Sequence, residues 1–241
     1  MNKRDTLSIL IPAYNEQNTI GKILDKLAVL CRNGICPEIR GIEIVIVNDG
    51  STDNTQEVID EFKDANPDLN VKDFRQPNGG KGLAIRKAIS EATSDILVVQ
   101  DADLEYEPED FAIMLPYITS GEYSVVYGSR FLNHRNKHSY NSFYIGGRLV
   151  SLVSNVLYGL HLTDEPTCYK MFTREVADSI KLKCTGFEFC PEFTAKVSKA
   201  GYSIQEVPIH YFPRSIEEGK KINWKDGVEA IWTLLKYRFV K

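Results

Sequence analysis

Short apolar runs alternate with segments of helical periodicity through the first half of the chain. Continuous runs over residues 7–11, 42–47 and 96–99 are typical of strands buried on both faces, and shorter strands are expected over 71–74 and 124–127. Between the first two runs, apolar residues recur at helical spacing, at Ile20, Ile23, Leu24, Leu27 and Leu30. Strand and helix therefore alternate, which predicts an α/β fold with a mainly parallel central sheet, flanking helices and right-handed crossovers.

Prolines and polar residues mark where the predicted elements begin and end. Pro12 removes a ladder donor and is expected to stop the first strand, after which Asn15 can cap the next helix. A second helix is expected to run through about Phe62. Two more are predicted to begin at the N-G-G-K-G segment and at Pro108, the latter reaching Tyr117.

Helical periodicity dominates after Gly128. Apolar residues between Leu149 and Leu160 mark an amphipathic helix, and residues 224–239 form another with a basic, aromatic end. These faces can pack on the domain, form an oligomer interface or rest on an anionic membrane. Three shorter elements complete the prediction: an edge strand over 167–173, a helix over 190–200 and a strand over 204–207.

Composition narrows the class of protein. The 241 residues are 43% hydrophobic and 26% charged, as expected of a globular chain with one substantial core. A net charge of −4 argues against a nucleic-acid binder. Five cysteines without a C-x-x-C pair argue against a disulfide scaffold or zinc site and suit a reducing cytoplasm. Because the sequence shows neither a signal-peptide pattern nor a run of about 20 apolar residues, we expect a soluble or peripheral protein.

The strand at 96–99 runs directly into two aspartates that are one residue apart. Ligands of open α/β sheets gather beyond the carboxyl ends of the strands, where Asp101 and Asp103 are expected to lie. In a strand-like extension both carboxylates would face one divalent cation together. An acidic turn fits this stretch equally well, because aspartate is common wherever strands end.

Two further loops, P-A-Y-N-E and N-D-G-S-T-D-N-T, are predicted to reach the same rim of the sheet. Tyr14 could flank a base, Glu16 and Asp49 could accept hydrogen bonds from a base or ribose, and Gly50 would let the backbone approach. Taken singly, D-G-S-T-D is more typical of a turn and helix cap. Only the convergence of the loops favours a nucleotide site.

Several basic residues are candidates for binding phosphate. The N-G-G-K-G segment could cradle an anion through its backbone N–H groups and Lys81. It lacks the length and the Ser or Thr of a P-loop, and no G-x-G-x-x-G follows the first strand, so ATPase and dinucleotide functions are disfavoured. Further candidates are Arg130, Arg214, Lys220 and Lys221.

Taken together, these motifs carry a resemblance to a known family. P-A-Y-N-E, V-N-D-G-S-T-D-N-T, N-G-G-K-G-x-A, D-A-D-L-E and G-S-R, in this order and spacing, resemble family 2 glycosyltransferases of the GT-A fold. The later signals T-D-E-P-T-C-Y-K, F-E-F-C-P-E and E-V-P-I-x-Y-x-P-R-x-x-x-E-G-K-K-I are similar to those of the polyprenyl-phosphate (dolichol-phosphate) hexosyltransferase branch. Each motif is weak alone, but the ordered set is specific and covers nearly the whole chain.

The resemblance implies a Rossmann-like GT-A domain that spans residues 1–241 and ends in amphipathic helices. Residues 1–130 would form the nucleotide-sugar-binding half and residues 131–241 the acceptor side. It also implies a UDP- or GDP-hexose donor and an Mg²⁺ or Mn²⁺ ion.

The family's functional positions can be matched residue by residue. The expected donor-binding set is Pro12, Tyr14, Glu16, Asp49, Ser51, Lys81, Asp101, Ala102, Asp103 and Lys220. The expected metal ligands are Asp101, Asp103 and Glu105; family members often have Gln at the last of these positions. Asp101, Asp103, Arg130 and Arg214 are the expected catalytic residues, with Asp164 and Glu192 on the acceptor side.

The function implied is an inverting, metal-dependent transfer of a hexose to a polyprenyl phosphate at the cytoplasmic face of a membrane. Peripheral membrane contact and a homo-oligomer are both candidates, and nucleic acid is not an expected partner. Two alternatives stay open: transfer to a saccharide or protein hydroxyl, and nucleotide-sugar binding without turnover.

Overall fold

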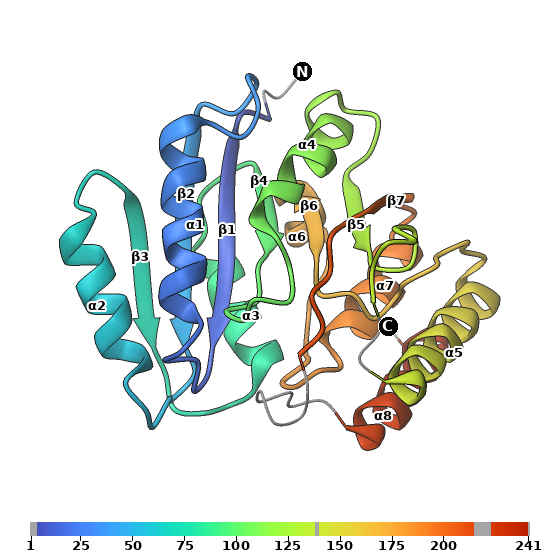
Figure 1. Cartoon of the computed structure of the whole chain (residues 1–241). Helices are drawn as coiled ribbons and strands as arrows, with labels where there is room; N and C mark the ends of the chain where they lie inside the picture. Colours follow the sequence, from blue (N-terminus) through green and yellow to red (C-terminus); the bar gives the residue numbers. More distant parts are fainter. Residues whose placement is uncertain (1–3, 138–139, 215–222, 241) are drawn as a thin grey trace.

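The computed structural model describes residues 4–137, 140–214 and 223–240, and one sheet runs through it (Figure 1). Its seven strands lie in the order β3 (Asn70–Arg75), β2 (Gly41–Asn48), β1 (Thr6–Ala13), β4 (Ile96–Val99), β6 (Lys170–Thr173), β5 (Val125–Ser129) and β7 (Ile204–Pro208). All neighbours pair in parallel except β6, which is antiparallel to both β4 and β5. The predicted mainly parallel α/β sheet is therefore confirmed.

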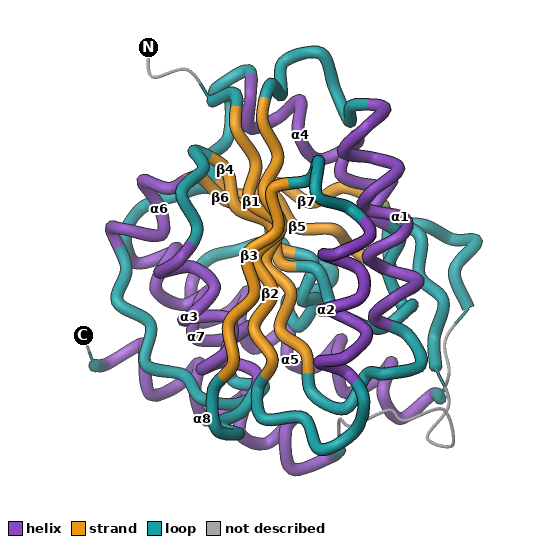
Figure 2. The backbone as a smooth tube through the Cα atoms, turned by 90° about the vertical axis from the view of Figure 1, so that its left-hand side faces the viewer, coloured by secondary structure: helices purple, strands orange, loops and turns teal. Residues whose placement is uncertain are grey.

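Helices cover both faces of the sheet, as the edge-on view shows (Figure 2). One face packs against α1 (Ile20–Asn33), α2 (Thr55–Ala65), the short 3-10 helix η1 (Pro108–Asp110) and α4 (Phe111–Thr119). The other packs against α3 (Lys81–Glu91), α6 (Arg174–Ser179) and α7 (Phe189–Lys199). The periodic residues of α1, Ile20, Ile23, Leu24 and Leu27, are fully buried because they all face the sheet.

The two amphipathic helices form a further layer on α7. Helices α5 (Asn141–Tyr158) and α8 (Trp224–Phe239) pack side by side at the end of the molecule remote from β3 (Figure 1). Their small shared core includes Val150, Ala195, Leu234 and Tyr237. The Tyr158 hydroxyl donates to the Leu234 carbonyl at 2.6 Å and ties the two helices together. In the described ranges, no helix combines the length and apolar character that crossing a bilayer requires.

The predicted edge strand over 167–173 is wrong in its position, because β6 lies inside the sheet. All four of its residues are buried, including Lys170. The Lys170 ammonium lies 3.4 Å from the centre of the Tyr127 ring and donates to the Glu165 carbonyl at 2.9 Å. These contacts let a charged residue occupy an interior strand, which the pattern of the strand alone does not indicate.

The two expected roles of Pro12 and Asn15 are also wrong. Strand β1 continues through Pro12 to Ala13, and because β4 ends opposite Leu10, the missing N–H falls where β1 is paired with β2 alone. Asn15 does not cap α1, which begins only at Ile20. It adopts a positive φ of 50° and uses its side chain to bridge to the next loop.

Other helix and strand boundaries also differ from those predicted from the sequence. Helix α5 begins well before Leu149, and α6 was not predicted because it buries a single residue, Val176, and so has no apolar period. The chain bends after β4 ends at Val99, so Asp101 and Asp103 do not extend the strand as expected.

A buried carboxylate joins the amino ends of the central strands. Glu43 on β2 accepts hydrogen bonds from the Ser8 hydroxyl at 2.5 Å and the Thr93 amide at 2.5 Å. It also forms an ion pair with Lys72 at 2.7 Å. Burial alone would raise the pKa of Glu43, but Lys72 and the hydrogen bonds lower it to about 2.

We expect Glu43→Gln to lower the free energy of unfolding by about 2–3 kcal/mol at pH 7. Because the folded pKa lies below the ordinary value of 4.5, the stabilisation by the carboxylate is complete above that value and disappears as the pH falls toward 2. Urea unfolding across this range should show the gap between variant and wild type closing. Glu61→Gln on the exposed side of α2 is the control. Equal losses for the two variants would contradict this role.

Candidate active site

The loops after β1 and β2 are joined by hydrogen bonds at the carboxyl end of the sheet. The Asn15 amide donates to the Ser51 hydroxyl at 2.9 Å, and the Asn15 side-chain oxygen accepts from the Thr52 amide at 2.8 Å. The Glu16 amide donates to the Thr55 hydroxyl at 2.8 Å. The predicted convergence of the P-A-Y-N-E and N-D-G-S-T-D-N-T loops is therefore confirmed.

Asp49 is held by the loop that was expected to cradle a phosphate. Its carboxylate accepts from the Gly79 amide at 3.0 Å, the Gly80 amide at 2.7 Å and the Gln76 side chain at 2.7 Å. Gly50 has a φ of +71°, and a Cβ there would lie 2.6 Å from the Asn78 nitrogen. Gly50 thus admits the neighbouring loop, and Asp49 fixes that loop in place.

Lys81 connects the start of α3 to the D-A-D loop. Its ammonium lies 2.6 Å from an Asp101 oxygen and 3.0 Å from the Cys168 sulfur. Although burial opposes the charge, Asp101 and Cys168 raise the pKa of Lys81 well above its ordinary value. A protonated lysine is therefore fixed beside the first aspartate.

Arg214, which follows β7, lies among three carboxylates. Its Nη2 atom is 2.6 Å from Asp103 Oδ2, its Nη1 atom is 3.4 Å from Glu16 Oε2, and its amide donates to Glu105 Oε1 at 2.9 Å. The Nε atom is buried and has no hydrogen-bond acceptor in the part of the chain that the structure describes. Arg214 thus joins the loops after β1 and β4.

Glu16, Asp101, Asp103 and Glu105 form a charged cluster with Lys81 and Arg214, and negative charge exceeds positive charge in it. Burial, followed by the charges of Asp101 and Glu105, raises the pKa of Asp103 to about 7, and Arg214 acts in the opposite direction. The oxygen-rich donor set Asp101, Asp103 and Glu105 therefore has the chemistry of a site for a hard divalent cation. Among the described residues, however, no group of three or more His, Cys, Asp or Glu side chains is arranged so that it could hold a metal ion, so the three expected ligands do not form a preformed metal site. Phosphate or water oxygens would have to supply the remaining ligands.

Arg130, which follows β5 and is partly buried, pairs with the fully buried Asp164. The guanidinium binds both oxygens of Asp164, at 2.7 Å each, and the Arg130 amide adds a third bond at 2.9 Å. The Arg130 guanidinium also lies over the Tyr211 ring, 5.4 Å from its centre. On α7, Glu192 accepts from the Lys183 amide at 2.7 Å and pairs with Lys196. The two acidic residues expected on the acceptor side are thus both engaged.

The other residues that were expected to bind the donor lie in different environments. Pro12 lies within β1, and Ala102 is buried in the core. Tyr14, in the loop after β1, is 37% exposed. Ser51 is engaged with Asn15, and Lys220 and Lys221 lie outside the described residues.

Three contributors were missed. Asn15 and Gln76 support the loops through side-chain contacts whose partners lie far along the chain. Cys168 lies in the T-D-E-P-T-C-Y-K signal, but nothing in that signal indicated its contact with Lys81. The G-G pair was noted as a phosphate cradle, and no sequence signal indicated that it would bind Asp49 instead.

Comparison with known proteins places this geometry in context. The model of glycosyl transferase family 2 matches residues 8–181. A dolichyl-phosphate beta-glucosyltransferase from Trichomonas vaginalis is 31% identical over 85% of this chain and 65% of its own length. Another from Dictyostelium discoideum is 26% identical over 97% of this chain and 74% of its own.

A glycosyltransferase from Haloferax volcanii is 29% identical over 87% of this chain and 64% of its own length. The chain therefore spans slightly less than two thirds of the Trichomonas and Haloferax relatives. Among solved structures, glucosyl-3-phosphoglycerate synthase from Mycobacterium tuberculosis, in complex with Mn²⁺ and UDP, has a TM-score of 0.69. At 19% identity, covering 98% of this chain and 81% of that one, this likeness shows the GT-A fold.

Asp103→Asn should stabilise the protein in the absence of divalent cations. A carboxyl group whose folded pKa is about 7, against an ordinary 3.8, destabilises the fold increasingly as the pH rises through that interval. We expect a gain of about 1–3 kcal/mol at pH 8 by urea unfolding, disappearing below pH 4. Asp64→Asn, on the exposed side of α2, is the matched control. A variant less stable than wild type at pH 8 would contradict the charge excess.

Proposed function

Because the chain belongs to glycosyl transferase family 2, we propose that it transfers a hexose from a UDP- or GDP-hexose to a polyprenyl phosphate. The observation that carries the proposal is the charged cluster at the rim, in which Lys81 and Arg214 hold Asp101 and Asp103. Two of the relatives are dolichyl-phosphate beta-glucosyltransferases, which supports a lipid phosphate as the acceptor. The division of the chain at residue 130 into donor and acceptor halves is part of this proposal.

On the donor side, exposed Tyr14 and the adjacent Glu16 would receive the nucleoside. Lys81 stays protonated in its partly buried position and would face the donor phosphates beside Asp101. An Mg²⁺ or Mn²⁺ ion, held by Asp101 and Asp103 with Glu105 as a third candidate, would stabilise charge on the departing nucleoside diphosphate.

The acceptor's own charge decides how much catalytic help is needed. A lipid phosphate is anionic near neutral pH, so one of its oxygens can attack the anomeric carbon directly and invert its configuration. The bond from that carbon to the donor phosphate breaks, and the nucleoside diphosphate leaves with the electron pair. Arg130 and Arg214 would orient the two anions, and this positioning is the protein's main contribution.

The state of the acidic residues favours a phosphate acceptor over a hydroxyl. A hydroxyl nucleophile needs a general base, for which Asp164 and Glu192 are the candidates. Asp164 is fully buried and already accepts three N–H bonds from Arg130, while Glu192 is 1% exposed and paired with Lys196. Asp164 is not placed to take a proton from a bound hydroxyl without first losing these partners, whereas Glu192 keeps one oxygen without a hydrogen-bond partner among the described residues.

A lipid acceptor also requires access to a membrane, and α5 and α8 offer a surface for it. Large apolar side chains are exposed on both helices, with Val156 at 76% and Phe239 at 83%. Ile145, Leu149 and Leu152 on α5 and Trp224, Val228 and Trp232 on α8 are exposed as well. With Lys236 and Arg238 in the last turn of α8, the surface combines apolar and basic groups as interfacial helices do. We propose that it rests peripherally on the cytoplasmic face of a bilayer.

Transfer can be measured with a panel of labelled UDP- and GDP-hexoses and undecaprenyl phosphate. We expect label in the lipid fraction with at least one donor, loss of the product with EDTA, and a drop of about 100-fold or more in Asp103→Asn, because a transition-state charge contact is removed. Asp64→Asn should retain full activity. Label found only on saccharide or protein hydroxyls would contradict the lipid acceptor.

Liposome co-sedimentation tests the surface of α5 and α8. The wild type should bind vesicles containing anionic lipid, and Trp232→Glu should weaken binding roughly tenfold, because a charge replaces an inserted apolar ring. Val29→Glu is the control, since Val29 is 56% exposed on α1, away from this surface. If vesicles are not bound and the protein instead self-associates through this face, the membrane proposal is wrong.

A further inference from the structure

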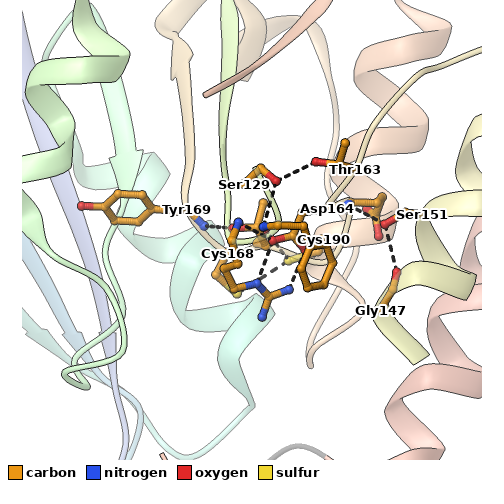
Figure 3. Close-up of polar contacts among 12 residues, drawn as sticks. Ser129, Gly147, Ser151, Thr163, Asp164, Cys168, Tyr169 and Cys190 are labelled. Carbon is orange, nitrogen blue, oxygen red and sulfur yellow. Dashed lines mark hydrogen bonds and ion pairs between the residues drawn. The ribbon is translucent and has the colours of Figure 1, made fainter. Parts of the chain in front are cut away.

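Two buried sulfur atoms face each other behind the donor-side cluster. Cys168 lies in the loop before β6 and Cys190 in the first turn of α7, with their sulfurs 3.6 Å apart (Figure 3). Cys190 is 4% exposed, whereas Cys168 is only half-buried. The two thiols are therefore neighbours, and Cys168 is the less buried of the two residues.

The surroundings of Cys168 favour its thiolate. The Lys81 ammonium lies 3.0 Å from the sulfur, and the Cys190 thiol is placed to donate to it. The hydrogen bond from Cys190, together with Lys81, holds the pKa of Cys168 below its ordinary value against the effect of burial. Cys31 differs, because burial raises the pKa of its thiol to about 11.

We propose that Cys168 and Cys190 form a redox pair in which Cys168 is the attacking thiol and Cys190 the resolving thiol. A partly buried thiolate beside a cation, with a second thiol in contact, resembles the arrangement of redox-sensing cysteines. The sulfurs need to approach by about 1.5 Å to reach disulfide bonding distance.

The oxidant is a small-molecule disulfide. The Cys168 thiolate attacks one of its sulfurs, forming a mixed disulfide and releasing one thiolate. Cys190 then loses its proton to solvent and attacks the Cys168 sulfur, which releases the second thiolate. Two protein thiols are oxidised to one disulfide while the oxidant is reduced to two thiols.

Closing this bond would affect the donor side through Lys81. A disulfide sulfur cannot provide the negative charge that Cys168 shares with Asp101 as a partner of Lys81. The balance of charge around Asp101 would then change. This consequence for donor binding rests on the proposed function, whereas the thiol chemistry does not.

Oxidised glutathione is the probe, and non-reducing peptide mass spectrometry is the readout. We expect the wild type to yield a cross-link between the peptides of Cys168 and Cys190. Cys190→Ser should stop at a glutathione adduct on Cys168, and Cys168→Ser should give no cross-link. Cys31→Ser, which removes a thiol on α1, should behave as the wild type. Glutathione on Cys31 or Cys36 without a cross-link between Cys168 and Cys190 would overturn the proposal.

Calorimetric titration with UDP or GDP and Mn²⁺ tests the consequence. Oxidised wild type should bind the nucleotide roughly tenfold more weakly than reduced protein, with recovery after a dithiol reductant, because the charge beside Lys81 is altered. Equal binding by the cross-linked and reduced forms would overturn the link to the donor side. Failure of both forms to bind either nucleotide would contradict the proposed function, and the cross-link would still decide the thiol chemistry.

Discussion

The balance of charge around Asp101 and Asp103 is the constraint on which the rest of the site depends. Carboxylates removed from water must be paired or protonated, and here four of them, Glu16, Asp101, Asp103 and Glu105, share two cations. Lys81 and Arg214 balance part of this negative charge. The pKa of Asp103 is raised because the rest of the charge is not balanced. A divalent cation with a bound diphosphate would add both charge and ligands to a cluster that is incomplete in both.

The same constraint explains why distant parts of the chain meet at one rim. Parallel pairing of β1, β2 and β4 brings three acidic loops together, and their mutual repulsion must be offset by cations from elsewhere. Lys81 comes from the start of α3, and Arg214 from the loop after β7, at the other side of the sheet. The second half of the chain thereby completes a site whose acidic residues come from the first half.

The sequence was sufficient to predict those features that depend on residues close together along the chain. Apolar runs such as 96–99 located the strands, and parallel order then predicted which loops would converge. The position of a strand within the sheet was harder to predict. Lys170 in β6 is typical of an edge strand, and it is tolerated inside the sheet because it contacts Tyr127 and Glu165. The Asp49 contacts to Gly79 and Gly80 and the Cys168 contact to Lys81 could not be predicted either. Side chains that meet far along the chain follow no fixed spacing.

The central claim is that Asp101 and Asp103 hold a divalent cation beside the phosphates of a nucleotide donor. The most direct measurement is anomalous diffraction from crystals grown with Mn²⁺ and UDP or GDP. The account predicts an anomalous peak bonded to carboxylate oxygens of these aspartates and to the diphosphate. A nucleotide bound at the rim without a peak there, or Mn²⁺ bound only at other residues, would contradict it.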